Sequence, residues 1–431
     1  MSNQSTKNND MNDDGMLNAE TQRKLPQGEI LQPKLRFKGF TDPWQQRKLG
    51  ELAEFSKGAG FSKSDLCEHG RGIILYGQMY TNYQLVIDCI STHVPMNSHG
   101  VESRRNDIIV PASGETPEDI ATASVVKLDG VLLGGDINVV RLHGNQTDAT
   151  FIALLLSHGS LHKTLASRAQ GKSIVHLHIS DIANLHVLKP GITEQSRIAE
   201  FFRVLDDLIA AAKKKADLLK LKKRYYLQAI FGQRLRFKGF TEPWQQRKLE
   251  ELCIRVGSGG TPSGQHPEYY NGKIPFLGIS DLSGRTVSAT QKKITQKGLD
   301  NSAAWLVPKG SITLAMYASV GKVAILGIEL VTSQAFFNMV IPEKTCIRDF
   351  LFSRLEKADI CHEWLPLIST GTQPNLNAAK LKDWELKVPS TQERKTIGEF
   401  FHALDDLAAA LARKIELLER RKTAYLQRLF V

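Results

Sequence analysis

The sequence predicts an α+β protein that is a tandem repeat with pseudo-two-fold symmetry, in which a mixed α/β domain followed by a long helix occurs twice. Residues 194–231 and 393–430 share one pattern, EFF-x-x-LDDL near the start and YLQ-x-x-F at the end. Residues 35–49 and 235–249 form an almost identical lead-in segment before each domain. Because internal duplication outranks other organisational signals, it sets the predicted boundaries: a tail (1–33), a first domain (34–192), a central helix (193–232), a second domain (233–390) and a C-terminal helix (391–431).

Both repeated helical segments carry an apolar residue at every seventh position. These positions are Ile198, Leu205, Ala212, Leu219 and Tyr226 in the first segment, and Ile397, Leu404, Leu411, Leu418 and Tyr425 in the second. A heptad repeat sustained in this way predicts coiled-coil helices. Since neither helix could bury such a stripe alone, we predict that the two pack on each other, antiparallel. At 1.5 Å per residue, each helix would be roughly 55 Å long.

The predicted helix ends carry matching signals. Ser390 and Glu393 have the spacing of a capping box, and Gly191 with Glu194 is a weaker version of it. Gly232 directly follows the first helix, at a position where glycine commonly ends helices. Basic residues crowd the last turns of both helices, as the helix dipole favours.

Strands are expected in both domains, but their sequences differ. In the first domain we expect strands at 73–76, 107–110, 124–128 and 137–142 and a helix from 150 to about 165. In the second we expect strands at 274–277, 311–316, 321–326 and 336–341 and a helical stretch near 346–365. Similar frames around dissimilar domains favour two different binding domains held at a fixed separation.

Charge favours nucleic acid as the partner. The chain has a formal net charge of +11, of which the tail contributes −2 and the two long helices +4 and +2, so a surplus of +7 lies elsewhere. Exposed helix surfaces therefore do not account for the excess, and a nucleic-acid partner is the leading interpretation.

Cysteine content and hydropathy bound the environment. The five cysteines form no CxxC motif, which argues against a zinc module and favours a reducing compartment, the cytoplasm. Cys67 with His69, and Cys361 with His362, are interpreted as packing residues. No apolar run approaches the ~20 residues that span a bilayer, and the polar residues 1–33 are interpreted as a disordered tail without a signal peptide.

No catalytic or cofactor-binding motif is complete in the sequence. There is no Pro-Pro pair for the tetrapeptide of a base-modifying enzyme, and Gly257–Gly260 is followed by Thr-Pro where a helix should open. Residues 166–173 are one glycine short of a phosphate-binding loop, and Glu385–Lys387 lacks the preceding acid of a nuclease. His176 and His178 alternate on a possible strand without a third ligand. We therefore expect no catalysis, metal or cofactor on this chain.

Polar, aromatic and glycine-rich loops remain as candidates for contact with base edges. Gln and Asn suit adenine, Lys suits guanine, and Ser or Thr suits either bases or phosphates. The candidates in the first domain are Lys57, Gln78, Tyr80, Thr81, Asn82, Tyr83, Ser113, Glu115 and Thr116. Those in the second domain are Ser258, Thr261, Ser280, Tyr317, Ser319, Lys322, Gln373 and Asn375.

Several of these segments occur together in one known family. They are the two lead-in segments, residues 108–116 and 134–138 of the first domain, residues 274–281 and 311–322 of the second, and the stretch GTQPNLN at 371–377. In this combination the chain resembles the DNA-specificity subunits of type I restriction–modification systems. The first domain differs in reading GKSIVHL at 171–177, where the family typically has an Asn-Leu pair.

The resemblance implies two target-recognition domains, each reading one half of a bipartite, asymmetric site in double-stranded DNA. The helices would set the spacing of the half-sites, about one duplex turn or roughly 34 Å, and would dock two methyltransferase (modification) subunits. Those subunits would bring S-adenosylmethionine and methylate adenine N6. Two translocating nuclease (restriction) subunits would complete a bacterial phage-defence complex in which this chain is not itself catalytic.

Two other function classes stay open on the sequence. A stand-alone DNA-binding regulator would need no enzyme partners, and co-purification with methyltransferase subunits would separate it from a specificity subunit. A single-chain methyltransferase or nuclease would show activity of the isolated chain with S-adenosylmethionine or Mg²⁺.

Overall fold

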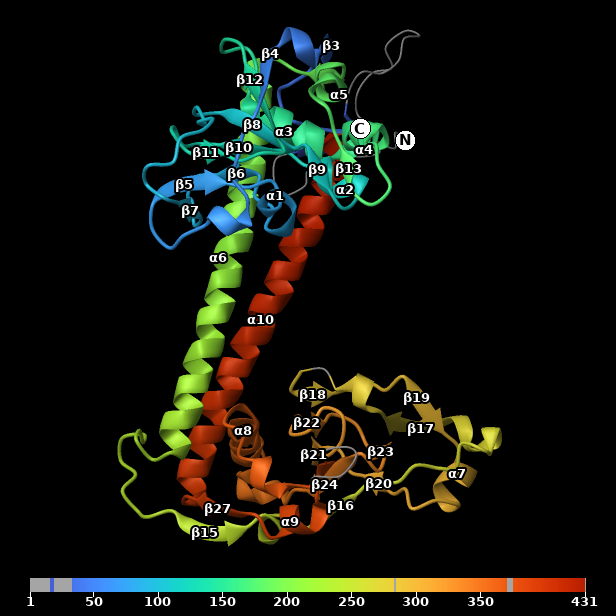
Figure 1. Cartoon of the computed structure of the whole chain (residues 1–431). Coiled ribbons are helices and arrows are strands. Elements are labelled where there is room, and N and C mark those ends of the chain that lie inside the picture. Colours follow the sequence, from blue (N-terminus) through green and yellow to red (C-terminus); the bar gives the residue numbers. More distant parts are fainter. Residues whose placement is uncertain (1–15, 19–32, 283, 370–374, 431) are drawn as a thin grey trace, which may run out of the picture. The chain divides into compact units, whose positions relative to one another are not determined.

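The structure, a computed structural model, describes residues 16–18, 33–282, 284–369 and 375–430. The chain divides into two compact units (Figure 1). Unit 1 comprises Met1–Ala211 and Ile415–Val431, and unit 2 comprises Ala212–Lys414. Each unit therefore contains one α/β domain, one half of the helix α6 (Ile192–Phe231) and one half of the helix α10 (Thr391–Leu429).

The first domain is built on a five-stranded sheet in the order β4-β12-β8-β10-β6. Its strands are β4 (Ala53–Lys57), β12 (Ile137–Leu142), β8 (Asp107–Pro111), β10 (Ser124–Val126) and β6 (Val86–Ile87). All neighbours are antiparallel except β6 and β10. A three-stranded sheet, β11 (Leu132–Leu133), β5 (Arg71–Ile74) and β7 (His93–Val94), accompanies it. The four predicted strands correspond to β5, β8, β10 and β12.

The second domain repeats this topology with other residues. Its five-stranded sheet runs β16 (Arg255–Ser258), β24 (Phe336–Val340), β21 (Ile312–Ala315), β22 (Val323–Leu326) and β18 (Thr286–Val287), again with one parallel pair, β18 and β22. A four-stranded sheet contains β19 (Lys292–Ile294), β17 (Tyr270–Leu277), β23 (Leu330–Thr332) and β20 (Leu306–Val307). The predicted strands correspond to β17, β21, β22 and β24.

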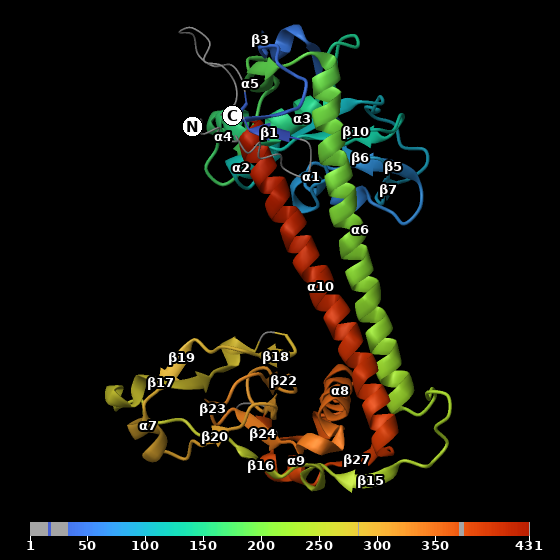
Figure 2. The same cartoon turned by 180° about the vertical axis from the view of Figure 1, so that it is seen from behind.

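Each lead-in segment closes its domain by pairing with the strand that precedes the long helix. In unit 1, β3 (Gln45–Lys48) is antiparallel to β14 (His186–Lys189), and in unit 2 β15 (Gln245–Lys248) is antiparallel to β27 (Glu385–Val388). Figure 2 shows β3 near the start of α6. This pairing explains why the lead-in sequence is duplicated together with the helix.

Short elements complete the two domains. The helices are α1 (Gln78–Thr81), α2 (Pro117–Ile120), α5 (Ile179–Ala183), α7 (Gln296–Asp300) and α9 (Ala378–Lys382). The strands are β2 (Leu35–Phe37), β9 (Ser113–Gly114), β13 (Val175–His176), β25 (Ile368–Ser369) and β26 (Asn375–Leu376). Within the predicted disordered tail, residues 16–18 form a strand, β1, antiparallel to β2, which the prediction did not include. The tail residues 1–15 and 19–32 lie outside the described residues.

The helix predicted from residue 150 to about 165 is two helices, α3 (Ala149–Ser157) and α4 (Gly159–Arg168). The break lies at Gly159, whose φ is +70°. A Cβ there would lie 2.5 Å from the backbone oxygen of Phe430, so a segment distant in sequence packs against the break. In the second domain, α8 (Ile347–Ile360) is shorter than the predicted helical stretch, and a 3-10 turn follows at Leu365–Leu367.

Helix α6 ends at Phe231, as predicted, but the residue with positive φ is Gln233 (φ 56°) and not Gly232. The Arg234 N–H donates to the Ala229 oxygen at 2.8 Å and the Gln233 N–H donates to the Ile230 oxygen at 2.9 Å, a Schellman arrangement. Glycine still matters at 232, because a Cβ there would lie 2.6 Å from the Gln228 oxygen.

The long helices pack antiparallel in each unit, with the same residue pairs. In unit 1, Phe201 meets Tyr425 at 5.2 Å between ring centroids and Asp206 meets Lys422 at 2.5 Å. In unit 2, the equivalent pairs are Phe400 with Tyr226, also at 5.2 Å, and Asp405 with Lys223. Both views show the half-helices side by side within each unit (Figure 1, Figure 2). The predicted fold class, two mixed α/β domains with an antiparallel pair of long helices in a tandem repeat, is confirmed.

The cores of both units contain the same tryptophan–phenylalanine contact. The lead-in residue Trp44 packs against Phe151 of α3 at 5.6 Å between centroids, and Trp244 packs against Phe350 of α8 at 5.9 Å. All four side chains belong to the buried cores, which also include the inner residues of the long helices. Each domain is therefore fixed to the helix halves of its own unit.

Candidate nucleic-acid interface

In each domain the central strand leads to a short segment that holds two of the polar candidates. In domain 1, Ser113 is only 4% exposed and His176 is exposed, and in domain 2 Tyr317 is 37% exposed. In unit 1, β8 continues into β9, which pairs with β13 and brings the Ser113 Oγ within 3.0 Å of the His176 Nδ1. The Leu177 N–H donates to the Ala112 oxygen at 2.9 Å. In unit 2, the Leu376 N–H donates to the Met316 oxygen at 3.0 Å. These matching bonds make the Ser113–His176 position in domain 1 equivalent to that of Tyr317 and Asn375 in domain 2.

Helix α1 brings a second group of predicted residues to the same region of domain 1. Tyr80 lies 6.4 Å from Tyr76 between ring centroids and approaches β9, since a Cβ on Gly114 would lie 3.8 Å from the Tyr80 ring. Burial raises the pKa of Tyr80, and the nearby Tyr76, Glu115 and Asp119 raise it further. The predicted candidates Tyr80, Ser113, Glu115 and Thr116 are thus brought together.

Other candidates of domain 1 make hydrogen bonds within the domain. The Gln78 Oε1 accepts from the Leu75 N–H at 3.2 Å, and the Thr81 hydroxyl donates to the Gly77 oxygen at 2.7 Å. The Tyr83 hydroxyl donates to the Ala123 oxygen at 3.3 Å, and burial raises the pKa of Tyr83 to about 12. Thr116 caps α2, accepting from the Asp119 N–H at 3.1 Å.

The remaining two candidates of this domain differ in place. Asn82 is exposed directly after α1, and Lys57 is exposed at the end of the edge strand β4. Lys57 and Asn82 are therefore open to an external ligand.

In domain 2 the candidates fall into two groups. Ser258 ends the edge strand β16 and Thr261 follows it. The Ser258 oxygen accepts from the Trp305 indole at 3.0 Å, and the Thr261 hydroxyl accepts from the Gln334 N–H at 3.5 Å. Tyr317, Ser319 and Lys322 occupy the turn between β21 and β22, close to β26 and Asn375.

Two candidates of domain 2 stand apart from these groups. Ser280 is exposed in the turn after β17. Gln373 lies outside the described residues.

The structure adds functional candidates that sequence reasoning missed. The Arg255 guanidinium stacks over the Trp305 ring at 3.8 Å, which presents a cation and an aromatic face together beside Ser258. On the sequence alone, His176 is weighed only for a catalytic triad or a metal set, and the constant register between the two copies is the signal that aligns it with Asn375. For Arg255 and Trp305 no such signal exists, because their contact joins β16 to the residue before β20, far apart in the sequence.

The predicted helix-pair residues lie where a helix seam requires. All ten, from Ile198 to Tyr226 on α6 and from Ile397 to Tyr425 on α10, are buried or half-buried. Ile198 and Ile397 are both fully buried. The heptad positions are thus the inward-facing positions of both helices.

Within the described ranges, no group of three or more His, Cys, Asp or Glu side chains could hold a metal ion. All five cysteines are free. No helix in the part of the chain that the structure describes is long and apolar enough to cross a bilayer.

Comparison with known proteins identifies similar chains. The sequence profile described as the type I restriction modification DNA specificity domain matches residues 41–221 and 241–420. The type I restriction enzyme MjaIX specificity subunit of Methanocaldococcus jannaschii is 33% identical over 181 residues, and the match spans only 41% of this chain and 41% of that relative. The MjaVIII specificity subunit of the same organism is 20% identical over 398 residues, covering 88% of this chain and 90% of the relative.

A solved structure shares the fold. The crystal structure of the type I restriction-modification system S subunit from M. genitalium superposes with a TM-score of 0.62 at 16% sequence identity. The superposition covers 93% of this chain and 99% of that chain.

Proposed function

The chain belongs to the family of type I restriction–modification DNA specificity domains, and from this premise we propose that it is a sequence-specific DNA-binding subunit. Each domain reads one half of a bipartite, asymmetric site in double-stranded DNA. The long helices set the distance between the half-sites and dock the partner enzymes. The chain supplies recognition and no catalysis.

One observation carries this proposal: the same topology is built twice with different polar residues at equivalent positions. Ser113 and His176 in domain 1 stand where Tyr317 and Asn375 stand in domain 2. A histidine and an asparagine present different patterns of donors and acceptors to a base edge. Two domains of one fold with unlike side chains at one place are suited to unlike half-sites.

The partners of this proposal are two methyltransferase subunits, which would carry S-adenosylmethionine, and two restriction subunits in the full complex. The long helices carry exposed leucines at equivalent positions: Leu208 on α6 matches Leu407 on α10, and Leu218 matches Leu417. These four side chains are between 42% and 52% exposed. Apolar side chains left open on a helix pair favour a protein partner, and their duplication favours two copies of it.

The test is an exchange of residues 250–390 for those of a related chain. The exchanged protein, expressed with its methyltransferase subunits, should modify a site in which one half is new and the other half is unchanged. Mapping methylated adenines across the host genome measures this directly. A change of both halves, or of neither, would contradict the assignment of one domain to each half-site.

The stand-alone regulator is the second candidate, and the comparisons give it no support. Co-purification decides between the two. A specificity subunit retains methyltransferase subunits through affinity purification of the tagged full chain, whereas a stand-alone regulator binds its DNA with no such partner.

A further inference from the structure

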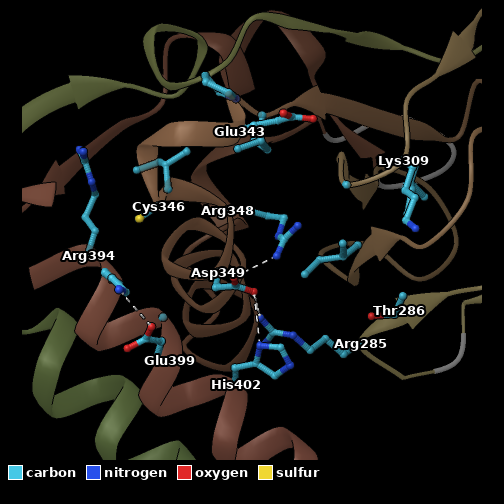
Figure 3. A pocket seen from close by; sticks show the side chains of 18 of the residues that line it. Arg285, Thr286, Lys309, Glu343, Cys346, Arg348, Asp349, Arg394, Glu399 and His402 are labelled. Carbon is cyan, nitrogen blue, oxygen red and sulfur yellow. Dashed lines mark hydrogen bonds and ion pairs between the residues drawn. The ribbon is translucent and has the colours of Figure 1, made fainter. Parts of the chain in front are cut away.

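A cavity of about 670 Å³ lies in unit 2, where α8 begins beside the first turns of α10 (Figure 3). Its walls come from the turn before β21, the edge strand β18, the start of α8 and the α10 side chains from Arg394 to His402. None of the candidate recognition residues lines it. The cavity is therefore a separate feature of the second domain.

The lining is rich in cations. Its described residues include Arg285, Lys309, Arg348, Arg394 and Lys395, against three carboxylates, Glu343, Asp349 and Glu399. In Figure 3, Arg348 extends into the middle of the cavity, and Lys309 lies on the wall opposite Arg394. A pocket with this excess of guanidinium and ammonium groups suits an anion.

The cations of the lining differ in how many of their donors are already bound by other groups of the protein. Arg285 is held by Asp349 and by Asp405, the latter at 2.6 Å. Lys309 has no ion-pair partner in the described part of the chain. Arg394 donates to the Thr391 hydroxyl at 2.7 Å, and its buried Nε has no partner among the described residues. Lys309 and Arg394 therefore have donors available for a ligand.

Helix α8 adds backbone donors to the same cavity. Its N-cap residue, Cys346, has a φ of 51° and its side chain accepts no hydrogen bond from the first turn. The first N–H groups of a helix need partners from outside the helix, and an anion is the partner that the helix dipole favours.

The first domain shows an anion at the equivalent place. Phe151 and Phe350 are equivalent, because each packs on the tryptophan of its lead-in segment. Just before Phe151, the Asp148 carboxylate accepts from the N–H groups of Thr150 at 2.9 Å and Phe151 at 3.0 Å. In domain 1, a carboxylate of the domain itself therefore binds the first N–H groups of this helix.

Domain 2 has no carboxylate at that position. The position of Asp148 corresponds to Ile347, which has no acceptor. Gln195, which follows Glu194, is fully buried and its Oε1 accepts from the Asp148 N–H at 3.0 Å. Its counterpart after Glu393 is Arg394. The second copy thus lacks this N-cap carboxylate, the Asp349 carboxylate in the first turn of α8 is held by Arg285, and Arg394 carries an unused donor.

We infer that this cavity binds a phosphate group, and that the DNA backbone flanking the half-site of domain 2 supplies it. The choice of DNA as the source rests on the proposed function. Free phosphate or a nucleotide offers the same chemistry, since each presents oxygens to the same guanidinium, ammonium and backbone donors.

The experiment uses the full chain and a duplex that contains the methylated site. The double variant Arg394→Gln with Lys309→Gln should reduce the slope of log affinity against log salt by about 1 for each lost phosphate contact. Affinity should fall alike on matched and mismatched duplexes, because a phosphate contact carries no sequence information. The matched control is Lys273→Gln, an exposed lysine of β17 outside the cavity, which should leave the slope unchanged.

A second variant tests the cavity with Arg394 and Lys309 left in place, in case their replacement disturbs the fold. Cys346→Asp adds a carboxylate beside the first turn of α8 and should compete with an external anion for the cations and N–H groups there, while thermal stability is kept. In parallel, titration calorimetry measures the binding of inorganic phosphate and of ATP to the unmodified chain and to both variants.

The outcomes separate the sources. A reduced salt slope in both variants assigns the phosphate to DNA. An unchanged slope, with phosphate or ATP binding that both variants abolish, assigns a free ligand to the cavity. If neither arm responds to the variants, the inference is wrong. Should the chain bind no duplex at all, the proposed function fails, and the calorimetric arm alone decides on the cavity.

Discussion

Arg36 and Glu194 form an ion pair in which each side chain is 3% exposed. The guanidinium donates twice to the carboxylate, at 2.6 Å and 2.9 Å, and ties the lead-in segment to the first turn of α6. Arg236 and Glu393 repeat the pair in unit 2, but there the arginine is 23% exposed and the Trp244 indole also donates to the carboxylate, at 3.2 Å. The two pairs have the same chemistry and differ in their access to water.

This difference predicts unequal costs of mutation. Arg36→Met should lower the free energy of unfolding of unit 1 by about 3–5 kcal/mol, because it leaves the Glu194 carboxylate buried without its partner. Arg236→Met should cost less in unit 2, because the Trp244 indole still donates to the buried Glu393 carboxylate and water can enter beside the partly exposed position 236. Hydrogen exchange of amides in each unit measures the two effects separately. Equal losses in the two units would show that burial does not govern the pair.

His158 predicts a dependence of stability on pH. Burial, together with Lys422 and His162 nearby, lowers the pKa of His158 to about 4, against an ordinary value of 6.5. Below pH 6.5 the unfolded chain takes up a proton that the folded chain refuses, so stability falls as the pH drops. The loss is on the order of 3 kcal/mol between pH 7 and pH 4. The melting temperature of unit 1 should vary less with pH across this range in His158→Gln than in the unmodified chain. An equal pH dependence in the two proteins would contradict the assignment.

At the scale of elements, sequence patterns predicted the helices and strands whose bounds depend on neighbouring residues. The heptads located α6 and α10 to within two residues at each end, and alternating apolar runs located most central strands. The break at Gly159 was missed because it is imposed by Phe430, far along the chain. The left-handed residue Gln233 was missed because glycine was expected to take that conformation.

For the candidate site too, the sequence predicted what depends on neighbouring residues and not what depends on distant ones. Loop composition predicted Ser113, Tyr80 and Tyr317 as candidates, but whether such a residue faces outward depends on pairing across the domain. Ser113 lies in β9 and is 4% exposed, whereas Tyr317 is 37% exposed. Tyr83 illustrates the limit: its neighbours favour a surface loop, yet its hydroxyl donates to Ala123 inside the domain. His176 joined the site only when β13 paired with β9.

The helices also predict how partners assemble. Leu218→Glu on α6 or Leu417→Glu on α10 should each remove one methyltransferase subunit, and the double variant should remove both, because the positions are equivalent and exposed. The fold should be retained, since neither side chain is buried. Mass photometry of the purified complex gives the stoichiometry, with Lys220→Glu, exposed on α6, as the control. Full assembly by the double variant would place the docking surface elsewhere.

At the scale of the whole molecule, the two domains share one strand order but are attached to their helix halves by different chemistry. In unit 1, Leu85 is buried at the residue before the parallel edge strand β6. In unit 2 the equivalent residue before β18 is Arg285, which bonds to Asp405 of α10 and Asp349 of α8. Duplication preserved the frame, while each domain acquired its own attachment and its own polar surface.

The continuity of α6, 40 residues, and α10, 39 residues, through both units leads to a prediction about spacing. Seven residues inserted into α6 near Ala211 add about 10 Å of helix, equivalent to about three base pairs at 3.4 Å each. The recognised site should then carry a longer unread gap, or binding should be lost because three base pairs also rotate one half-site by roughly 100° around the duplex. A matched insertion in both helices keeps the heptad seam in register and should favour the longer gap over loss. Methylation mapping gives the gap length directly, and an unchanged site after either insertion would refute the helices as the ruler.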